Sequence, residues 1–171
     1  MTTEIHWLRA IKVNLIPIFF QNSIMAQDSE HETLQYVKIT SRATSPTRAY
    51  GDSAGIDIHS AHDYKITPLG MKEVLTDIRV KLPKGTYGRI AARSGATTAK
   101  QIIIGAGVID PNYVGNITIP VFNLSDTDCL IKAGSSFAQL ICERIAKPTI
   151  IKVPELSHTE RGEKGFGSSD K

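Results

Sequence analysis

Short segments with an alternating pattern constrain the fold more than any other feature of this sequence. Between Val74 and Leu82 the even positions hold Val, Thr, Ile, Val and Leu, whereas the odd positions are mostly charged. Successive side chains of a strand point to opposite faces, so this alternation is typical of a strand with one buried face. The pattern predicts a half-buried strand over 74–82.

Two further segments, 116–124 and 137–145, are similarly short and rich in residues that favour strands. Pro120 lies in the first of them and predicts a sheet edge or a bulge, because proline has no N–H for the ladder. Only 94–100 predicts a helix, and it is short. Turn signals separate the segments, at 68–70, 83–85, 110–111 and 132–134. Several short strands between turns indicate an all-β barrel or sandwich.

The 171 residues divide by composition into three parts. Residues 1–30 hold an apolar stretch of about half the roughly 20 residues that a bilayer span needs. They are either a disordered or upstream-encoded extension, with Met25 as an alternative start, or a targeting peptide, mitochondrial or secretory. A mitochondrial location follows from a transit peptide, and a cytoplasmic or nuclear one from its absence. Residues 31–153 form the β domain, and the polar, glycine-rich 154–171 form a C-terminal arm and flap.

Composition argues against several classes of protein. Lys and Arg number 20 against 17 Asp and Glu, too small a surplus for a nucleic-acid binder, and we expect neither nucleic acid nor a membrane as partner. Cys129 and Cys142 make no disulfide framework or zinc pair, and are expected as buried thiols. His59 and His62 lack a third ligand nearby in sequence, which favours surface histidines. Common motifs of nucleotide loops and hydrolases are absent from the sequence.

Five segments hold more Gly, Arg, Ser and Asp than strands require, at 54–61, 88–95, 105–116, 134–144 and 161–169. Glycine is expected where the backbone approaches a ligand closely or takes a positive φ. Arg93, Ser94 and Gly95 suit a phosphate site, because they offer a fork of N–H donors, a hydroxyl and a close backbone approach. The alternative is a turn with a structural salt bridge.

In their order and spacing, the five segments resemble those of the homotrimeric deoxyuridine triphosphatases, or dUTPases, over about residues 35–169. The resemblance implies a jelly-roll-like β-sandwich and the Mg²⁺-dependent hydrolysis of dUTP to dUMP and pyrophosphate, which lowers dUTP and supplies dUMP for dTMP synthesis. It also implies a homotrimer with shared active sites. One subunit supplies the first, second and fourth segments, another the third, and the remaining one the flap. An isolated protomer is then expected to be inactive.

The resemblance assigns roles within the third segment. Asp110 orients and activates the water that attacks the α-phosphorus, although an Asp before proline is also a common turn former. Tyr113 packs on the deoxyribose and excludes a 2′-hydroxyl, the alternative being a core tyrosine. Hairpin backbone reads uracil and excludes cytosine and thymine, at Gly107, Val108 and Ile109.

Phosphate and metal contacts are implied for the other segments. Arg93, Ser94 and Gly95 bind the phosphate chain, and Gln139 contacts a phosphate unless it is an exposed strand residue. Asp57 lies between two isoleucines and needs a partner, so it either pairs with an arginine or lies near Mg²⁺-bound phosphates, acting through water.

The last segment resembles a closing flap, the alternative being a disordered tail. Arg161 meets the γ-phosphate and Phe166 stacks on uracil, with further contacts from Gly167 and Ser168. Lys164, Ser169 and Asp170 depart from the family's usual ending, so we expect closure with altered strength. Two rival functions stay open: a dCTP deaminase, which shares the fold but needs an additional Glu, and a catalytically silent regulatory relative.

Overall fold

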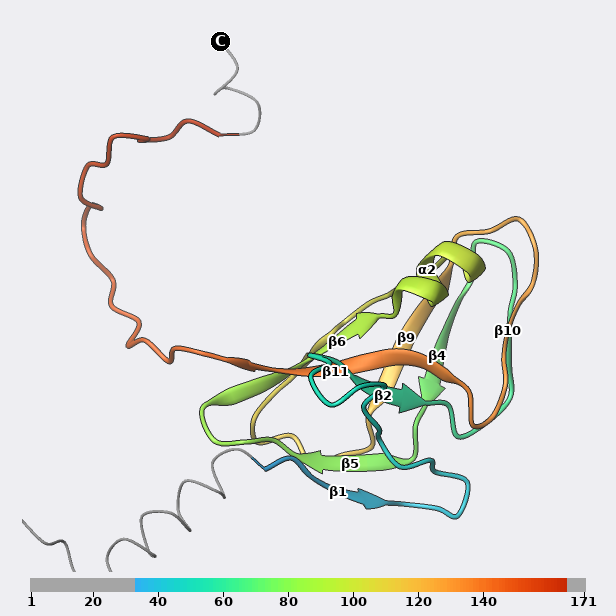
Figure 1. Ribbon diagram of the computed structural model, residues 1–171. Coiled ribbons are helices and arrows are strands. Elements are labelled where there is room, and N and C mark those ends of the chain that lie inside the picture. The colour runs from blue at the N-terminus through green and yellow to red at the C-terminus, as the bar shows by residue number, and fades with distance from the viewer. Residues whose placement is uncertain (1–32, 166–171) are drawn as a thin grey trace, which may run out of the picture.

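Antiparallel strands make up most of the regular secondary structure of the described chain, residues 33–165 of the computed structural model (Figure 1). One short helix, α2 (Ser94–Lys100), accompanies them in this part of the chain. The strands are β1 (Gln35–Lys38), β2 (Ile56–His59), β3 (Tyr64–Ile66), β4 (Met71–Leu75), β5 (Ile78–Lys81), β6 (Thr86–Ala92), β7 (Ile102–Ile104), β8 (Val108–Ile109), β9 (Thr118–Asn123), β10 (Cys129–Ile131) and β11 (Ser136–Arg144). The all-β expectation is confirmed, and the predicted helix has the predicted bounds.

Two larger sheets are ordered β2-β11-β6-β8 and β4-β9-β7, and β1-β5 and β10-β3 form two further two-stranded sheets. Strand β11 pairs with β2 on one side and with β6 along the other. The first, second and fourth glycine-rich segments therefore lie side by side, and β8 carries the third segment next to β6. The order of the strands thus brings together residues that lie between positions 56 and 144 of the sequence.

Alternate strand residues pack into one hydrophobic core. Ile56 and Ile58 of β2 are buried, and so is Leu140 of β11. Fully burying a side chain of this kind stabilises the fold by about 1.5–3 kcal/mol. Most of the buried core residues are isoleucine, valine or leucine, because the sequence contains few aromatic residues.

The predicted strand over 74–82 is wrong in one respect, because it is two strands. Its even positions are all buried, as predicted, but β4 ends at Leu75 and β5 begins at Ile78. Asp77 between them has a φ of 52°, in the left-handed region. This residue turns the chain from the sheet of β4 to that of β5, and it is itself only 5% exposed.

The prediction that Pro120 marks a sheet edge or a bulge is also wrong, because β9 is the central strand of β4-β9-β7 and pairs with both neighbours in regular register. The carbonyl of Pro120 accepts a hydrogen bond from the N–H of Gly105, just beyond the end of β7. Carbonyl and nitrogen of one residue point to the same side of an antiparallel strand. The missing N–H therefore faces the side on which the β7 ladder has ended, and the central position tolerates proline.

The cysteines were expected to be buried and the histidines to lie at the surface. Cys129 is buried and Cys142 half-buried, both are free thiols, and burial raises the pKa of each. The surface prediction is wrong for His59, whose Nδ1 atom is buried. Among residues 33–165, no group of three or more potential metal-binding side chains occurs, and no helix is long and apolar enough to span a membrane.

The predicted N-terminal extension, residues 1–30, lies outside the described residues. After β11 the chain leaves the β domain, and no strand or helix follows within 145–165 (Figure 1).

Candidate active site

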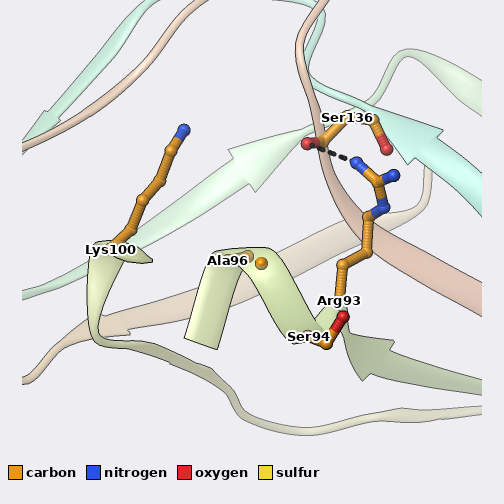
Figure 2. A pocket seen from close by; sticks show the side chains of 6 residues that line it. Arg93, Ser94, Ala96, Lys100 and Ser136 are labelled. Atoms are coloured by element: carbon orange, nitrogen blue, oxygen red, sulfur yellow. Dashed lines mark hydrogen bonds between the residues drawn. The ribbon is translucent and has the colours of Figure 1, made fainter. Parts of the chain in front are cut away.

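The second segment borders a pocket of about 230 Å³ where β6 passes into α2. The pocket is lined by Arg93, Ser94, Gly95, Ala96, Lys100 and Ser136 (Figure 2). Figure 2 shows the two cationic side chains on opposite sides of the helix turn. A Cβ added at Gly95 would meet nothing within 4 Å, so packing within the protomer does not require this glycine. The residues are therefore suited to an anion that approaches the backbone closely.

Arg93 joins the first, second and fourth segments. Its Nε atom lies 3.0 Å from Oδ1 of Asp57 on β2, and its Nη1 donates to the carbonyl of Ser136 at 3.4 Å. Asp57 is 16% exposed, so the pair is partly shielded from water. An arginine has five N–H donors, and these two contacts leave the group suited to bind a phosphate as well. The structure thus contains the arginine pair that was one of the two alternatives for Asp57.

Gln139 lies opposite Asp57 in the β2-β11 register. Its Nε2 atom donates to the carbonyl of Ala92 at 3.0 Å, immediately before Arg93. A Cβ added at Gly55 would lie 1.9 Å from Oε1 of Gln139, so the side chain packs directly over that glycine. Asp57, Arg93 and Gln139 therefore form one cluster, as the resemblance implied, and Gln139 is half-buried rather than exposed.

Two polar atoms beside this cluster were not expected from the sequence. Nδ1 of His59 and Oγ of Ser136 are buried and have no hydrogen-bond partner among the described residues. The two residues face each other across β2 and β11, and Ser136 lines the pocket. Burial lowers the pKa of His59, Asp57 raises it and Arg93 lowers it, with a net decrease. His59 is therefore neutral at neutral pH, and its burial differs from the surface position that its spacing from His62 had favoured.

The third segment begins with a close approach of two backbones. The N–H of Ile90 donates to the carbonyl of Gly107 at 2.7 Å, and a Cβ at Gly107 would lie 2.6 Å from the carbonyl oxygen of Ile90. No side chain fits at this position without a backbone shift. Beyond it, Val108 is exposed and Ile109 is buried on β8.

Asp110 follows β8 and is exposed. Its carbonyl accepts the N–H of Tyr113 at 3.0 Å, so the residue also forms the turn that was its alternative interpretation. Tyr113 is 43% exposed and is not a core residue. Its hydroxyl donates to the carbonyl of Asn116 at 2.7 Å. Asp110 and Tyr113 therefore lie on one exposed, hydrogen-bonded turn.

The pocket at α2 lacks the third and fifth segments. Its described lining comes from the second and fourth segments, and from α2 itself. In the fifth segment, Arg161 is exposed and its Nε donates to the carbonyl of Lys164 at 2.9 Å. The other predicted flap residues lie outside the described residues: Phe166, Gly167 and Ser168.

The donor set next to the pocket fits a hydrated Mg²⁺ ion. Asp57 supplies a carboxylate there, and residues 33–165 contain no cage of three potential ligands. Mg²⁺ usually keeps several waters and binds through one or two carboxylates together with substrate phosphates. A single carboxylate beside a phosphate site is consistent with that mode.

Comparisons with known proteins identify the family of the chain. A model of the dUTPase family matches residues 41–170. The deoxyuridine 5′-triphosphate nucleotidohydrolase of Mus musculus is 44% identical over 146 residues, which are 85% of this chain and 90% of the mouse protein. The mitochondrial deoxyuridine 5′-triphosphate nucleotidohydrolase of Homo sapiens is 46% identical over 138 residues, which are 81% of this chain but only 55% of the human protein.

Solved structures show the same fold. The dUTPase of Staphylococcus bacteriophage 80alpha with dUPNHPP is 32% identical, with a TM-score of 0.73 over 80% of this chain and 98% of the phage protein. A mutant dUTPase of S. aureus phage phi11, described for its coordination of a structural Mg(II) ion, is 26% identical, with a TM-score of 0.69 over 74% and 99% of the two chains. By sequence and by structure, the chain belongs to the dUTPase family.

Proposed function

We propose that this dUTP diphosphatase hydrolyses dUTP to dUMP and pyrophosphate with a water molecule that Asp110 activates. The observation that carries the proposal is the cluster of Asp57, Arg93 and Gln139, which three distant segments bring together beside a cationic pocket. A cluster of this kind suits the triphosphate, and the exposed turn of Asp110 and Tyr113 is available for the sugar and the attacking water.

In the reaction, the carboxylate of Asp110 accepts a proton from the water as its oxygen bonds to the α-phosphorus. The bond to the bridging oxygen breaks, and pyrophosphate leaves. Arg93 and the hydroxyl of Ser94 hold the phosphate chain in line, because fixed donors stabilise the charge that develops on its oxygens. Mg²⁺, which a phage relative is described as coordinating, would be held by Asp57 through water and would neutralise phosphate charge. Hairpin backbone at 107–109 reads uracil.

A homotrimer with shared active sites is part of the proposal. Within one protomer the pocket at α2 contains nothing from the described third segment. Apolar side chains of that segment are exposed, Val108 at 64% and Val114 at 65%. Neighbouring subunits would cover these side chains and complete the site, with gain in buried apolar area. The arm beyond β11 leaves its own domain, as a segment that reaches a neighbour must (Figure 1).

The domain boundaries at 30 and 153 are proposed with this arrangement. A mitochondrial relative supports a leader within residues 1–30, and without one the enzyme would act in the cytoplasm or nucleus. A fluorescent reporter fused to residues 1–30 tests this proposal. Mitochondrial fluorescence is expected for a leader, and diffuse fluorescence would contradict it.

A substrate panel tests the proposed mechanism. Pyrophosphate release from dUTP, dCTP, dTTP and UTP is measured with and without Mg²⁺, on protein whose mass in solution is known. Asp110→Asn should keep nucleotide binding but lose most turnover, by about 10²–10⁴-fold. Asp126→Asn, at an exposed aspartate between β9 and β10, is the matched control and should stay fully active. Near-normal turnover of Asp110→Asn would refute its role, and deamination of dCTP would favour the rival enzyme class.

A further inference from the structure

A buried acid at the break between β4 and β5 connects to the turn that carries Tyr113. Oδ2 of Asp77 accepts the hydroxyl of Thr40 at 2.7 Å and faces Nε2 of His62 at 3.3 Å. Its Oδ1 accepts Nδ2 of Asn116 at 3.1 Å. Burial alone would raise the pKa of Asp77, but the hydrogen bonds from Thr40 and Asn116 and the facing His62 lower it below its ordinary value. Asp77 is therefore a buried carboxylate, charged at neutral pH and held by three separate segments.

Asn116 is the last residue of the third segment and is fixed on two sides. Besides the bond to Asp77, its Oδ1 lies 3.4 Å from the hydroxyl of Thr76, which makes its shorter hydrogen bond to the carbonyl of Ile117 at 2.8 Å. In the described chain, these are the side-chain hydrogen bonds that join residues 110–116 to the rest of the β domain. The position of the turn therefore depends on the side chain of Asn116.

Tyr113 in turn depends on Asn116. The tyrosine hydroxyl donates to the main-chain carbonyl of Asn116, and a Cβ added at Gly115 would lie 2.5 Å from that hydroxyl oxygen. The aromatic ring thus lies against the backbone of 115–116. A contiguous set of hydrogen bonds runs from the carboxylate of Asp77 through Asn116 to the phenol of Tyr113.

We propose that Asp77 and Asn116 are positioning residues whose pair sets the place of the Tyr113 ring and thereby the preference for deoxyribose over ribose. The inference rests on the proposed role of Tyr113. Steric exclusion of a 2′-hydroxyl requires the tyrosine ring to be held rigidly. Displacement of the ring should therefore raise kcat/KM for UTP relative to kcat/KM for dUTP. Neither residue needs to contact the nucleotide.

A charge-preserving swap tests the pair. In Asn116→Asp two carboxylates face each other, and in Asp77→Asn two amides do. In the double variant the amide donates from position 77 to a carboxylate at position 116, and the remaining oxygens still accept from Thr40 and Thr76. Each single variant should lower the ratio of kcat/KM for dUTP to that for UTP by at least about fivefold, within the usual range for directly coupled residues. The double variant should recover most of the ratio.

The Tyr113→Ala background separates this inference from the role of Tyr113 itself. With the tyrosine absent, Asn116→Asp should not change the ratio further. If Tyr113→Ala leaves selectivity unchanged, the tyrosine does not read the sugar, and both proposals fall. If Tyr113→Ala relaxes selectivity but Asn116→Asp lowers only the melting temperature, the pair is merely structural and this inference alone falls.

A milder variant keeps the inference testable if the charged variants do not fold. Tyr113→Phe removes only the hydroxyl that donates to Asn116 and keeps the ring. It should lower the dUTP to UTP ratio in the same direction as Asn116→Asp, by a smaller factor. An unchanged ratio would contradict the claim that this hydrogen bond fixes the position of the Tyr113 ring.

Discussion

Gly107→Ala should damage both folding and catalysis, because the added Cβ has no room. It would lie 2.6 Å from the carbonyl oxygen of Ile90, which is backbone and cannot rotate away as a side chain can. The shift it forces acts on the bond from the N–H of Ile90 to the carbonyl of Gly107, 2.7 Å long. Leaving that N–H unpaired in a largely buried setting costs about 1–3 kcal/mol. The free energy of unfolding should fall by about that amount.

Gly95→Ala is the matched comparison, since the same methyl group there meets nothing within 4 Å. Alanine is the better helix former, so α2 should gain up to about 1 kcal/mol. Both variants should lower kcat/KM for dUTP. Gly107→Ala disturbs the hairpin that reads uracil, and Gly95→Ala obstructs the phosphate site. Gly51→Ala, also in open space but outside the five segments, should change neither quantity appreciably.

Urea unfolding and steady-state kinetics on the three variants give the measurement. Opposite signs of the stability change at Gly107 and Gly95, with a loss of activity in both, are the expected result. Unchanged stability of Gly107→Ala would refute the close approach of the two backbones. Destabilisation of Gly95→Ala by more than about 1 kcal/mol would show that its surroundings are not open.

Three further predictions concern selectivity, the arm and acid stability. Tyr113→Ala should relax the bias against UTP in competition assays, and unchanged selectivity would place the reading of the sugar elsewhere. Deleting 160–171 should preserve the mass of the assembly and greatly reduce turnover; unaffected turnover would remove the flap from the mechanism. Folding lowers the pKa of Asp77. Its contribution to the free energy of unfolding is therefore present at a pH above its pKa in the unfolded chain, about 3.9, and is lost as the pH falls through its pKa in the folded protein. Asp77→Asn should therefore lower the free energy of unfolding by about 1–3 kcal/mol at neutral pH. The difference from the wild type should become smaller in acid, and a difference that does not change with pH would contradict the lowered pKa.

The sequence predicts the local elements well where local physics decides them. Residues 94–100 form the predicted helix, and β11 covers most of the segment 137–145, whose strand-favouring residues predict a strand. The cluster of Asp57, Arg93 and Gln139 follows from the resemblance, and the antiparallel order β2-β11-β6 is its physical cause.

The sequence does not predict features that depend on partners far along the chain. Asp77 occupies an odd position in an alternating strand, where a charge indicates the surface, yet Thr40 and Asn116 make its burial favourable. Pro120 indicates an edge, but β7 ends where the proline nitrogen points. His59 follows Ile58 and precedes Ser60 in sequence, and its buried ring nitrogen lies on β2 opposite Ser136 of β11, a neighbour that the sequence does not indicate.

Mixing two inactive variants tests the shared active site most directly. Arg93→Ala lacks the phosphate site and Asp110→Asn lacks the activating carboxylate, so each alone should be nearly inactive. If a site takes these groups from different subunits, random co-assembly of equal amounts leaves about one quarter of the sites complete. Turnover of dUTP should then rise to about a quarter of the wild-type value per site after the subunits are unfolded and refolded together. A refolded mixture no more active than either variant alone would contradict the shared site.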